Sequence, residues 1–374
     1  MVDLKGQYER IKSEIRLSFD EILNTTSFIN GPAVHNFQKE LEDYLGVKHV
    51  IPCANGTDAL QIAMMGLGLE PGDEVITADF TFAATAEVIA LLRLTPVLVD
   101  VDPDTFNIDP EAIEKAITPK TKAIVPIHLF GQAANMEEIM VIAKKHNLFV
   151  IEDNAQATGA DYVFKDGSKQ KTGTIGHVGA TSFFPSKNLG CYGDGGALFT
   201  NDDDLAHRLR GIVNHGMYER YYHDVVGVNS RLDSFQAAVL STKLPHLDAY
   251  NRARRAAAQK YSEAFVSNTQ IKTPKILNET HDNTHVFHQY CICILNGKRD
   301  ALAGHLKEKG IPFGIYYPVP LHLQKAYLDD RYKPEQFSVT NKISEQIIAL
   351  PMHTELEEEQ IEFITKTIND FVGN

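Results

Sequence analysis

The sequence predicts an α/β fold in which a large domain with a mostly parallel sheet is followed by a smaller C-terminal α+β domain. Two observations support this prediction. Short apolar segments alternate with helical segments through residues 1–245, a pattern typical of parallel strands joined by crossover helices. The chain also has 374 residues with 43% hydrophobic content, which is enough for about two domains of ordinary size.

Hydrophobic periodicity places the elements of the first part. The chain opens with an amphipathic helix, in which apolar residues recur near helical spacing at Ile11, Ile15, Phe19, Ile22 and Leu23. Apolar strands then follow at residues 49–52, 74–77, 95–100, 123–127, 148–151, 180–184 and 196–200. Parallel sheets bind ligands at the carboxyl ends of their strands, so polar residues just after these segments are the candidates for a site.

The pattern changes near Pro245, where a long charged helix is expected from Asp248 to Phe265. The part that follows mixes helices with strands, which are predicted at residues 289–295 and 312–316. The last helix is predicted to open at Thr354-Glu-Leu-Glu357, which has the form of a capping box. We therefore expect a large α/β domain with its leading helix over residues 1–245 and a small C-terminal domain over residues 246–374.

The composition indicates a soluble protein. A net charge of −13, from 36 basic and 49 acidic residues, disfavours binding to a nucleic-acid backbone. Charged residues interrupt residues 1–15, so no secretion signal is visible, and apolar runs are shorter than the roughly 20 residues of a membrane span. The four cysteines form no C-x2-C pair, which favours a reducing cytoplasm. Cys291 and Cys293 lie in an alternating segment and are predicted to be buried thiols in a strand.

Two charged residues follow predicted strands and are candidates for catalysis. Asp153 ends the strand Phe149-Val-Ile-Glu-Asp153, where a carboxylate would suit a protonated pyridine nitrogen. A helix cap or an ion pair is the alternative. Lys187 lies between an apolar strand and a glycine-rich turn. Burial there would lower the pKa of its amine and make it a nucleophile and proton shuttle, whereas a surface lysine in a glycine loop is the alternative.

Two other strand-to-helix junctions could hold parts of a ligand. Ala54-Asn-Gly-Thr-Asp58 precedes an apolar helix, and a helix N-terminus with glycine and threonine offers N–H groups and a hydroxyl to a phosphate. An ordinary Asn-Gly turn is the alternative. Asp79-Phe-Thr-Phe82 places aromatic rings at the second junction, where a ring could stack on a planar cofactor or pack in the core.

In this order, the segments resemble the fold-type I pyridoxal 5'-phosphate (PLP) enzymes and, more narrowly, the DegT-type nucleotide-sugar aminotransferases. The similarity covers nearly the whole chain. The matching motifs are Asn55-Gly-Thr-Asp-Ala59, Phe80-Thr-Phe82, Glu152-Asp-Asn-Ala-Gln156, Ser182-Phe-Phe-Pro-Ser-Lys187, Gly193-Asp-Gly-Gly196 and Gly227-Val-Asn-Ser-Arg-Leu-Asp233. The resemblance implies a PLP-dependent transaminase that takes its amino group from glutamate and works as a homodimer with shared active sites.

The resemblance also implies roles for individual residues. Lys187 is similar to the Schiff-base lysine, Asp153 to the partner of the pyridine nitrogen, and Gln156 to the group that contacts the phenolic oxygen. Among the remaining implied cofactor contacts, Gly56, Thr57 and Ser182 bind the phosphate and Phe82 contacts the ring. Asn229 is similar to an asparagine that reaches from one subunit to the cofactor phosphate in the neighbouring subunit. The implied substrate contacts are Arg231, Tyr316, Tyr317 and His128.

Within the family, the glycine-rich turn and His128-Leu-Phe-Gly-Gln132 look most similar to enzymes that aminate C3 of UDP-2-acetamido-2-deoxy-3-oxo-glucuronate, which implies a role in surface polysaccharide synthesis. Tyr316 departs from this group, in which a histidine is common at that position. A dTDP-linked 3-keto-6-deoxyhexose and a 4-keto sugar therefore remain alternatives.

Other classes of function have less support in the sequence. The sugar dehydratases of the family lack the anchoring lysine, so Lys187 argues against them. A PLP-sensing regulator would need a DNA-binding domain, which we do not expect in this acidic chain. His281, His285 and His288 could suggest zinc, but they lie in a polar segment outside the matching motifs, and three histidines alone are weak evidence for a zinc site. We expect no metal site.

Overall fold

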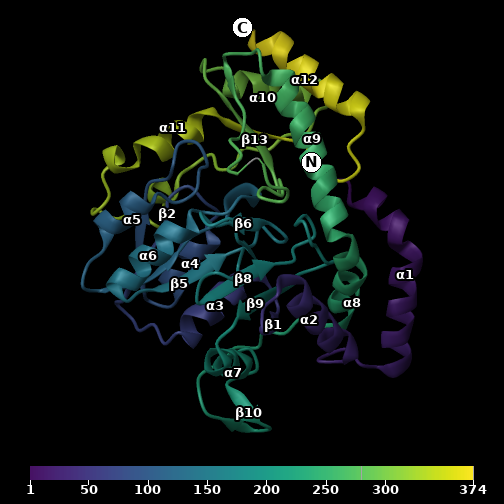
Figure 1. The fold of residues 1–374 in the computed structure, drawn as a ribbon, viewed down its shortest axis with the longest axis vertical. Coiled ribbons are helices and arrows are strands. Elements are labelled where there is room, and N and C mark those ends of the chain that lie inside the picture. The colour runs from purple at the N-terminus through teal and green to yellow at the C-terminus, as the bar shows by residue number, and fades with distance from the viewer. Residues whose placement is uncertain (279, 374) are drawn as a thin grey trace.

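A computed structural model describes residues 1–278 and 280–373 (Figure 1). The main sheet has seven strands, in the order β1 (His49–Cys53), β9 (Gly196–Thr200), β8 (Val178–Ser182), β5 (Phe149–Asp153), β4 (Thr121–Val125), β2 (Glu74–Ala78) and β3 (Thr95–Val99). Strand β9 runs antiparallel to both neighbours, and the other pairs are parallel. The predicted α/β fold with a largely parallel sheet is confirmed.

Helices cover both faces of this sheet. Successive strand residues such as Val75 and Ile76 belong to different hydrophobic cores, as expected for side chains that alternate between the faces of a sheet. One core contains side chains of α3 (Gly56–Gly66), α4 (Ala84–Leu91) and α7 (Asp203–Ile212). The other contains side chains of α5 (Pro110–Ala116) and α6 (Met136–His146). With both faces covered, the strand ends are left to present polar groups.

A third cluster packs the N-terminal helices against the edge of the sheet. It joins α1 (Leu4–Thr25), α2 (Pro32–Leu45) and α8 (Ser234–Lys243) to apolar residues of β1 and β9. The apolar face predicted for α1 is only partly buried. Ile11, Ile15 and Ile22 are buried, whereas Leu23 is 54% exposed.

The C-terminal part has its own sheet and core (Figure 1). Strands β12 (Ile271–Lys272), β13 (Tyr290–Ile294) and β14 (Ile347–Leu350) form an antiparallel sheet. The helices of this part are α9 (Leu247–Phe265), α10 (Arg299–Glu308), α11 (Ser338–Gln346) and α12 (Glu358–Val372). Cys291 and Cys293 point from β13 into the core of the large sheet, and both thiols are buried and free as predicted. The domain boundary at residue 245 stays a prediction.

Some local expectations are wrong. Residues 312–316 form no strand and contribute one isolated bridge, from Gly314 to Ala349. Helix α12 begins at Glu358, and its capping box uses Glu357 and Gln360 instead of Thr354. Two short hairpins are not among the predicted elements: β6 (Asp161–Val163) with β7 (Lys169–Lys171), and β10 (Met217–Glu219) with β11 (Tyr222–His223).

The remaining helical elements are the short 3-10 turns η1 (Leu129–Gly131), η2 (Leu244–His246), η3 (Leu321–Leu323) and η4 (Pro334–Phe337). Within the described part of the chain, no helix is long and apolar enough to cross a lipid bilayer.

Candidate active site

Asp153 and Lys187 come together at the carboxyl ends of neighbouring strands. β5 and β8 are parallel, with Asp153 paired to Ala180, and Lys187 follows β8 by five residues. The two side chains are close enough for each charge to alter the pKa of the other. The structure therefore places the predicted catalytic pair in one site.

The surroundings of Asp153 prepare its carboxylate for one cationic partner. The side chain is buried, and Oδ2 accepts a hydrogen bond from Thr85 Oγ1 at 3.0 Å while Oδ1 accepts one from Ala155 N at 3.1 Å. Burial raises the pKa of Asp153, whereas these hydrogen bonds and the charge of Lys187 oppose that rise. A nearby cation would stabilise the charged form further.

Lys187 has the properties of a reactive amine. Burial lowers the pKa of its ammonium group to about 8, and the charge of Asp153 opposes this shift. Its loop is held by neighbouring side chains, because Asn188 Nδ2 donates to Asn251 Oδ1 at 2.7 Å and Lys243 Nζ donates to Gly190 O at 2.7 Å. An amine whose pKa is near neutrality is available both as a nucleophile and as a carrier of protons.

The predicted phosphate ligands lie at the N-terminus of α3. Asn55 caps this helix, accepting a hydrogen bond from Asp58 N at 2.8 Å. Gly56 packs directly on Ser182, since a Cβ added at Gly56 would lie 2.6 Å from Ser182 Cβ. The close approach brings the helix N-terminus, Thr57 and the Ser182 hydroxyl to one place, which suits an anion.

Aromatic side chains form the wall of the site beside these groups. Phe82 is 60% exposed, and its ring centroid lies 6.4 Å from that of Tyr317. Tyr317 in turn accepts a hydrogen bond at its hydroxyl from Gln156 Nε2 at 3.1 Å, and Gln156 Oε1 accepts one from Phe130 N at 2.7 Å. An exposed ring beside buried polar groups offers a flat ligand a stacking surface.

These residues fit the PLP implied by the sequence resemblance. PLP needs an amine for its aldehyde, an anion for its pyridine nitrogen, N–H groups for its phosphate and an aromatic surface for its ring. The site provides these in Lys187, Asp153, the N-terminus of α3 and Phe82. The link between Gln156 and Tyr317 joins residues 161 positions apart in the chain, and no local sequence pattern indicates it.

The predicted substrate contact of His128 is not supported by this structure. The ring is fully buried. Its Nδ1 accepts a hydrogen bond from Ala134 N at 3.1 Å, so Nε2 carries the proton and donates to Glu152 Oε2 at 2.8 Å. With both nitrogens engaged, the ring has no free group to offer a sugar.

Glu152 has a structural role that the sequence analysis did not identify. Besides His128, its carboxylate accepts hydrogen bonds from the backbone N–H groups of Gly173, Ile175 and Gly176 at 2.6 to 2.8 Å. Glu152 thus fixes the turn that follows β7 to the end of β5, next to Asp153.

The other predicted contacts are dispersed. Asn229 is exposed and pairs through its backbone with Asn214, while Arg231 Nη1 donates to Asn214 Oδ1 at 3.3 Å. Ser230, between them, accepts a hydrogen bond from Ala54 N at 3.0 Å, which places the segment near the N-terminus of α3. Tyr316 is half-buried with its ring against Gly314.

His285 and His288 of the histidine series are buried. Burial lowers the pKa of His285 to about 3 and that of His288 well below its usual range, where the charges of Lys187 and Arg254 add to the effect. Among residues 1–278 and 280–373, no group of three or more His, Cys, Asp or Glu residues has a geometry suited to a metal ion.

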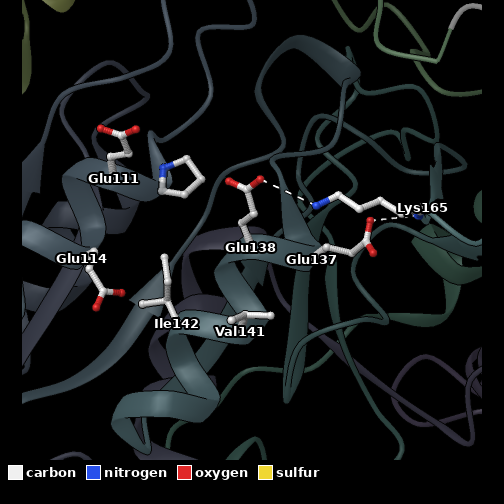
Figure 2. Close-up of a pocket in the computed structure, with 8 residues that line it drawn as sticks. Glu111, Glu114, Glu137, Glu138, Val141, Ile142 and Lys165 are labelled. Atoms are coloured by element: carbon white, nitrogen blue, oxygen red, sulfur yellow. Dashed lines mark hydrogen bonds and ion pairs between the residues drawn. The ribbon is translucent and has the colours of Figure 1, made fainter.

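A separate pocket lies between α5 and α6 (Figure 2). Glutamates dominate its lining, and its one lysine, Lys165, pairs with Glu138 at 3.9 Å and donates its backbone N–H to Glu137 at 3.0 Å. None of the predicted site residues lines this pocket, and its acidic lining is unsuited to a phosphate.

Comparisons with known proteins give matches over nearly the whole chain. Residues 9–369 match the model of the DegT/DnrJ/EryC1/StrS aminotransferase family. A pleiotropic regulatory protein of Geobacillus stearothermophilus is 48% identical over 99% of this chain and 98% of its own. A UDP-2-acetamido-2-deoxy-3-oxo-D-glucuronate aminotransferase of Pseudomonas aeruginosa is 45% identical over 99% of each chain. A DegT DnrJ EryC1 StrS aminotransferase from Brucella abortus, for which a crystal structure is known, is 43% identical in sequence. The two structures superpose with a TM-score of 0.93, which covers 100% of this chain and 99% of the Brucella chain.

Proposed function

Given that this chain belongs to the DegT/DnrJ/EryC1/StrS aminotransferase family, we propose that it transfers an amino group from glutamate to C3 of UDP-2-acetamido-2-deoxy-3-oxo-glucuronate. The chain is a PLP-dependent sugar aminotransferase. The single observation that best supports the reaction is Lys187, an amine whose pKa is lowered to about 8 beside the buried carboxylate of Asp153.

Bound PLP supplies an electron sink that makes transamination possible. In the proposed mechanism, Lys187 holds the cofactor and then moves protons at its Nζ in both half-reactions. Asp153 keeps the pyridine nitrogen protonated, and Thr85 and Ala155 orient its carboxylate by their hydrogen bonds. Gln156 would contact the phenolic oxygen of the cofactor.

The remaining contacts would position the ligands. Gly56, Thr57 and Ser182 would bind the phosphate at the N-terminus of α3, and Phe82 would offer its face to the cofactor ring. We assign Tyr316 and Tyr317 to the sugar side of the site, since Tyr317 lies against Phe82. His128 is not included, because both of its nitrogens are engaged within the protein.

The choice of sugar rests on similarity. The 45% identical relative is named for UDP-2-acetamido-2-deoxy-3-oxo-D-glucuronate, whereas others at 38% and 40% identity are named for dTDP-linked 3-amino sugars. A dTDP-3-keto-6-deoxyhexose is thus the alternative substrate, and a 4-keto sugar is the third. From the sequence resemblance, we assign the product to surface polysaccharide synthesis in the cytoplasm.

A regulatory role is a second candidate, because the 48% identical relative is named a pleiotropic regulatory protein. A half-reaction assay separates these possibilities. The enzyme is loaded with pyridoxamine phosphate, and UDP- and dTDP-linked 3-keto and 4-keto sugars are screened for return of the PLP absorbance. The proposal predicts the fastest return with the UDP-3-keto uronate. Faster return with a dTDP sugar would select the alternative, and no return with any sugar would favour regulation.

We also propose that two chains complete each active site as a homodimer. Asn229 is exposed and Arg231 is half-buried, so a second copy can approach this segment. The adjacent hairpin β10–β11 projects from the molecule (Figure 1) and exposes Tyr221 and Tyr222 by 75% and 64%. Exposed aromatic residues of this kind are typical of an interface, and an isologous dimer would exchange the two segments.

Subunit mixing tests the shared site. The test uses two variants that we expect to be inactive on their own. One is Lys187→Ala, and the other combines Asn229→Ala with Arg231→Ala. In a heterodimer, one site contains both lesions and the other contains neither, so about half of the wild-type activity per heterodimer should return. Verified heterodimers that remain inactive, although both parents fold and dimerise, would place Asn229 and Arg231 in their own chain's site.

A further inference from the structure

A buried carboxylate and a buried imidazole connect the large sheet to the loop that carries the two tyrosines. Asp79 follows β2, and its Oδ1 accepts a hydrogen bond from His322 N at 2.7 Å. Asp79 Oδ2 accepts a second one from His322 Nδ1 at 2.6 Å, and Leu321 N donates to the carbonyl of Asp79 at 3.3 Å. Both side chains are almost fully buried, so water does not compete for these bonds.

The two connected segments lead directly to the site. Asp79 immediately precedes Phe80 and lies three residues before Phe82, and His322 lies five residues after Tyr317. The Tyr317 ring centroid is 5.8 Å from that of Phe80 and 6.4 Å from that of Phe82. These segments therefore meet twice, once at the buried pair and once where the aromatic wall lines the site.

The imidazole is held in a single orientation. Its ring stacks on Phe337, with centroids 4.3 Å apart and an angle of 15° between the planes. Nδ1 is bound to Asp79, and the buried Nε2 has no hydrogen-bond partner among the described residues. Burial raises the pKa of Asp79 to about 6, and the contact with His322 opposes that rise. Removing either partner would leave the other without its hydrogen bond in a dry environment.

We propose that Asp79 and His322 are positioning residues, which hold the loop of Tyr316 and Tyr317 against the Phe80–Phe82 segment and so set the width of the cofactor and sugar site. Neither side chain needs to touch a ligand, because the effect passes through Phe82 and Tyr317. Displacement of the positioned groups by about 1 Å can cost on the order of 100-fold in rate. The inference rests on the proposed function, since it assigns Phe82 and Tyr317 to that site.

The chain offers a matched control in Asp100. This carboxylate follows β3 and accepts hydrogen bonds from Val339 N, Thr340 N and Thr340 Oγ1 at 2.8 to 2.9 Å. It thus fastens the same C-terminal part to the carboxyl end of the strand next to β2. The charge of Asp100 also raises the pKa of Asp79, but its hydrogen bonds lie more than 20 residues after Tyr317. Its loss should therefore affect stability and leave the Asp79–His322 bonds and the aromatic wall in place.

The experiment measures PLP binding and the visible circular dichroism of the bound cofactor, which reports the ring environment and requires no sugar. Asp79→Ala and His322→Phe should each change the dichroism and weaken PLP binding by roughly tenfold, which is less than the loss of rate on the order of 100-fold that a displacement of about 1 Å can cause. Asp100→Ala should leave both within about twofold. His322→Asn retains a side-chain N–H and should recover part of the loss. The double variant should bind PLP about as tightly as the single variant with the lower PLP affinity, because the pair acts as one unit.

The proposal is overturned if Asp79→Ala and His322→Phe retain wild-type dichroism and PLP affinity, if Asp100→Ala changes both equally, or if the effects of the two single variants add. Should Asp79→Ala fail to fold, Asp79→Asn replaces it, because its amide oxygen still accepts the His322 backbone N–H. A wild-type protein that binds PLP but aminates no keto sugar would refute the proposed function and leave this test valid.

Discussion

The lowered pKa of Lys187 gives a quantitative prediction for the cofactor-free protein. At pH 7.5, an amine with a pKa of about 8 is roughly one quarter neutral, whereas a lysine with the ordinary value of 10.5 is about 0.1% neutral. The neutral amine is the form that attacks an aldehyde. Lys187 should therefore capture PLP about 200-fold faster than an exposed lysine of equal intrinsic reactivity.

Stopped-flow absorbance at a series of pH values measures this capture. The rate should rise with pH and level off above a midpoint near 8, because burial disfavours the ammonium form. Asp153→Asn removes a charge that favours the ammonium form, so the midpoint should fall further. Burial also lowers the pKa of Lys243 to about 8, but this lysine only supports the Lys187 loop through Gly190. Lys187→Ala should therefore abolish the fast phase, whereas Lys243→Met should slow it without abolishing it. A midpoint near 10, or a fast phase that persists without Lys187, would refute the reasoning.

Other variants test individual contacts. Asp153→Asn should cost about 3 kcal/mol of transition-state stabilisation, roughly a 100-fold loss of turnover, and near wild-type turnover would contradict its assignment to the pyridine nitrogen. Glu152→Ala leaves the His128 ring N–H and the N–H groups of Gly173, Ile175 and Gly176 without their acceptor. Its free energy of unfolding, measured in urea, should fall by about 3 kcal/mol, and an unchanged value would disprove the structural role. Phe82→Ala should weaken PLP binding by about 1 kcal/mol through lost stacking, which titration measures, and unchanged affinity would remove Phe82 from the site.

Hydrophobic pattern was sufficient to predict the main sheet. Each of its strands is a short apolar run between polar segments, so its position and type could be inferred, and the side-by-side arrangement of β5 and β8 brings Asp153 and Lys187 together. By contrast, residues 312–316 have a strand-like composition but form only one bridge to β14. Tertiary packing decides such short segments, and composition alone does not reveal it.

Long-range contacts explain what the sequence analysis missed at the site. His128 follows a strand, as a ligand contact would, yet its two hydrogen bonds to Glu152 and Ala134 occupy the ring. Asp79 and His322 are 243 positions apart, and no local pattern links them. Periodicity and motifs specify which residues reach a strand end, whereas the partners of a buried polar group depend on the folded chain.

The central claim is that Lys187 is the residue that holds PLP. Reduction of the PLP-loaded enzyme with borohydride, followed by proteolysis and mass spectrometry, tests it most directly. We expect one stable phosphopyridoxyl label, on the peptide that contains Lys187, and no such label in Lys187→Ala. Recovery of the label on Lys243 or another lysine, with Lys187 unmodified, would contradict it.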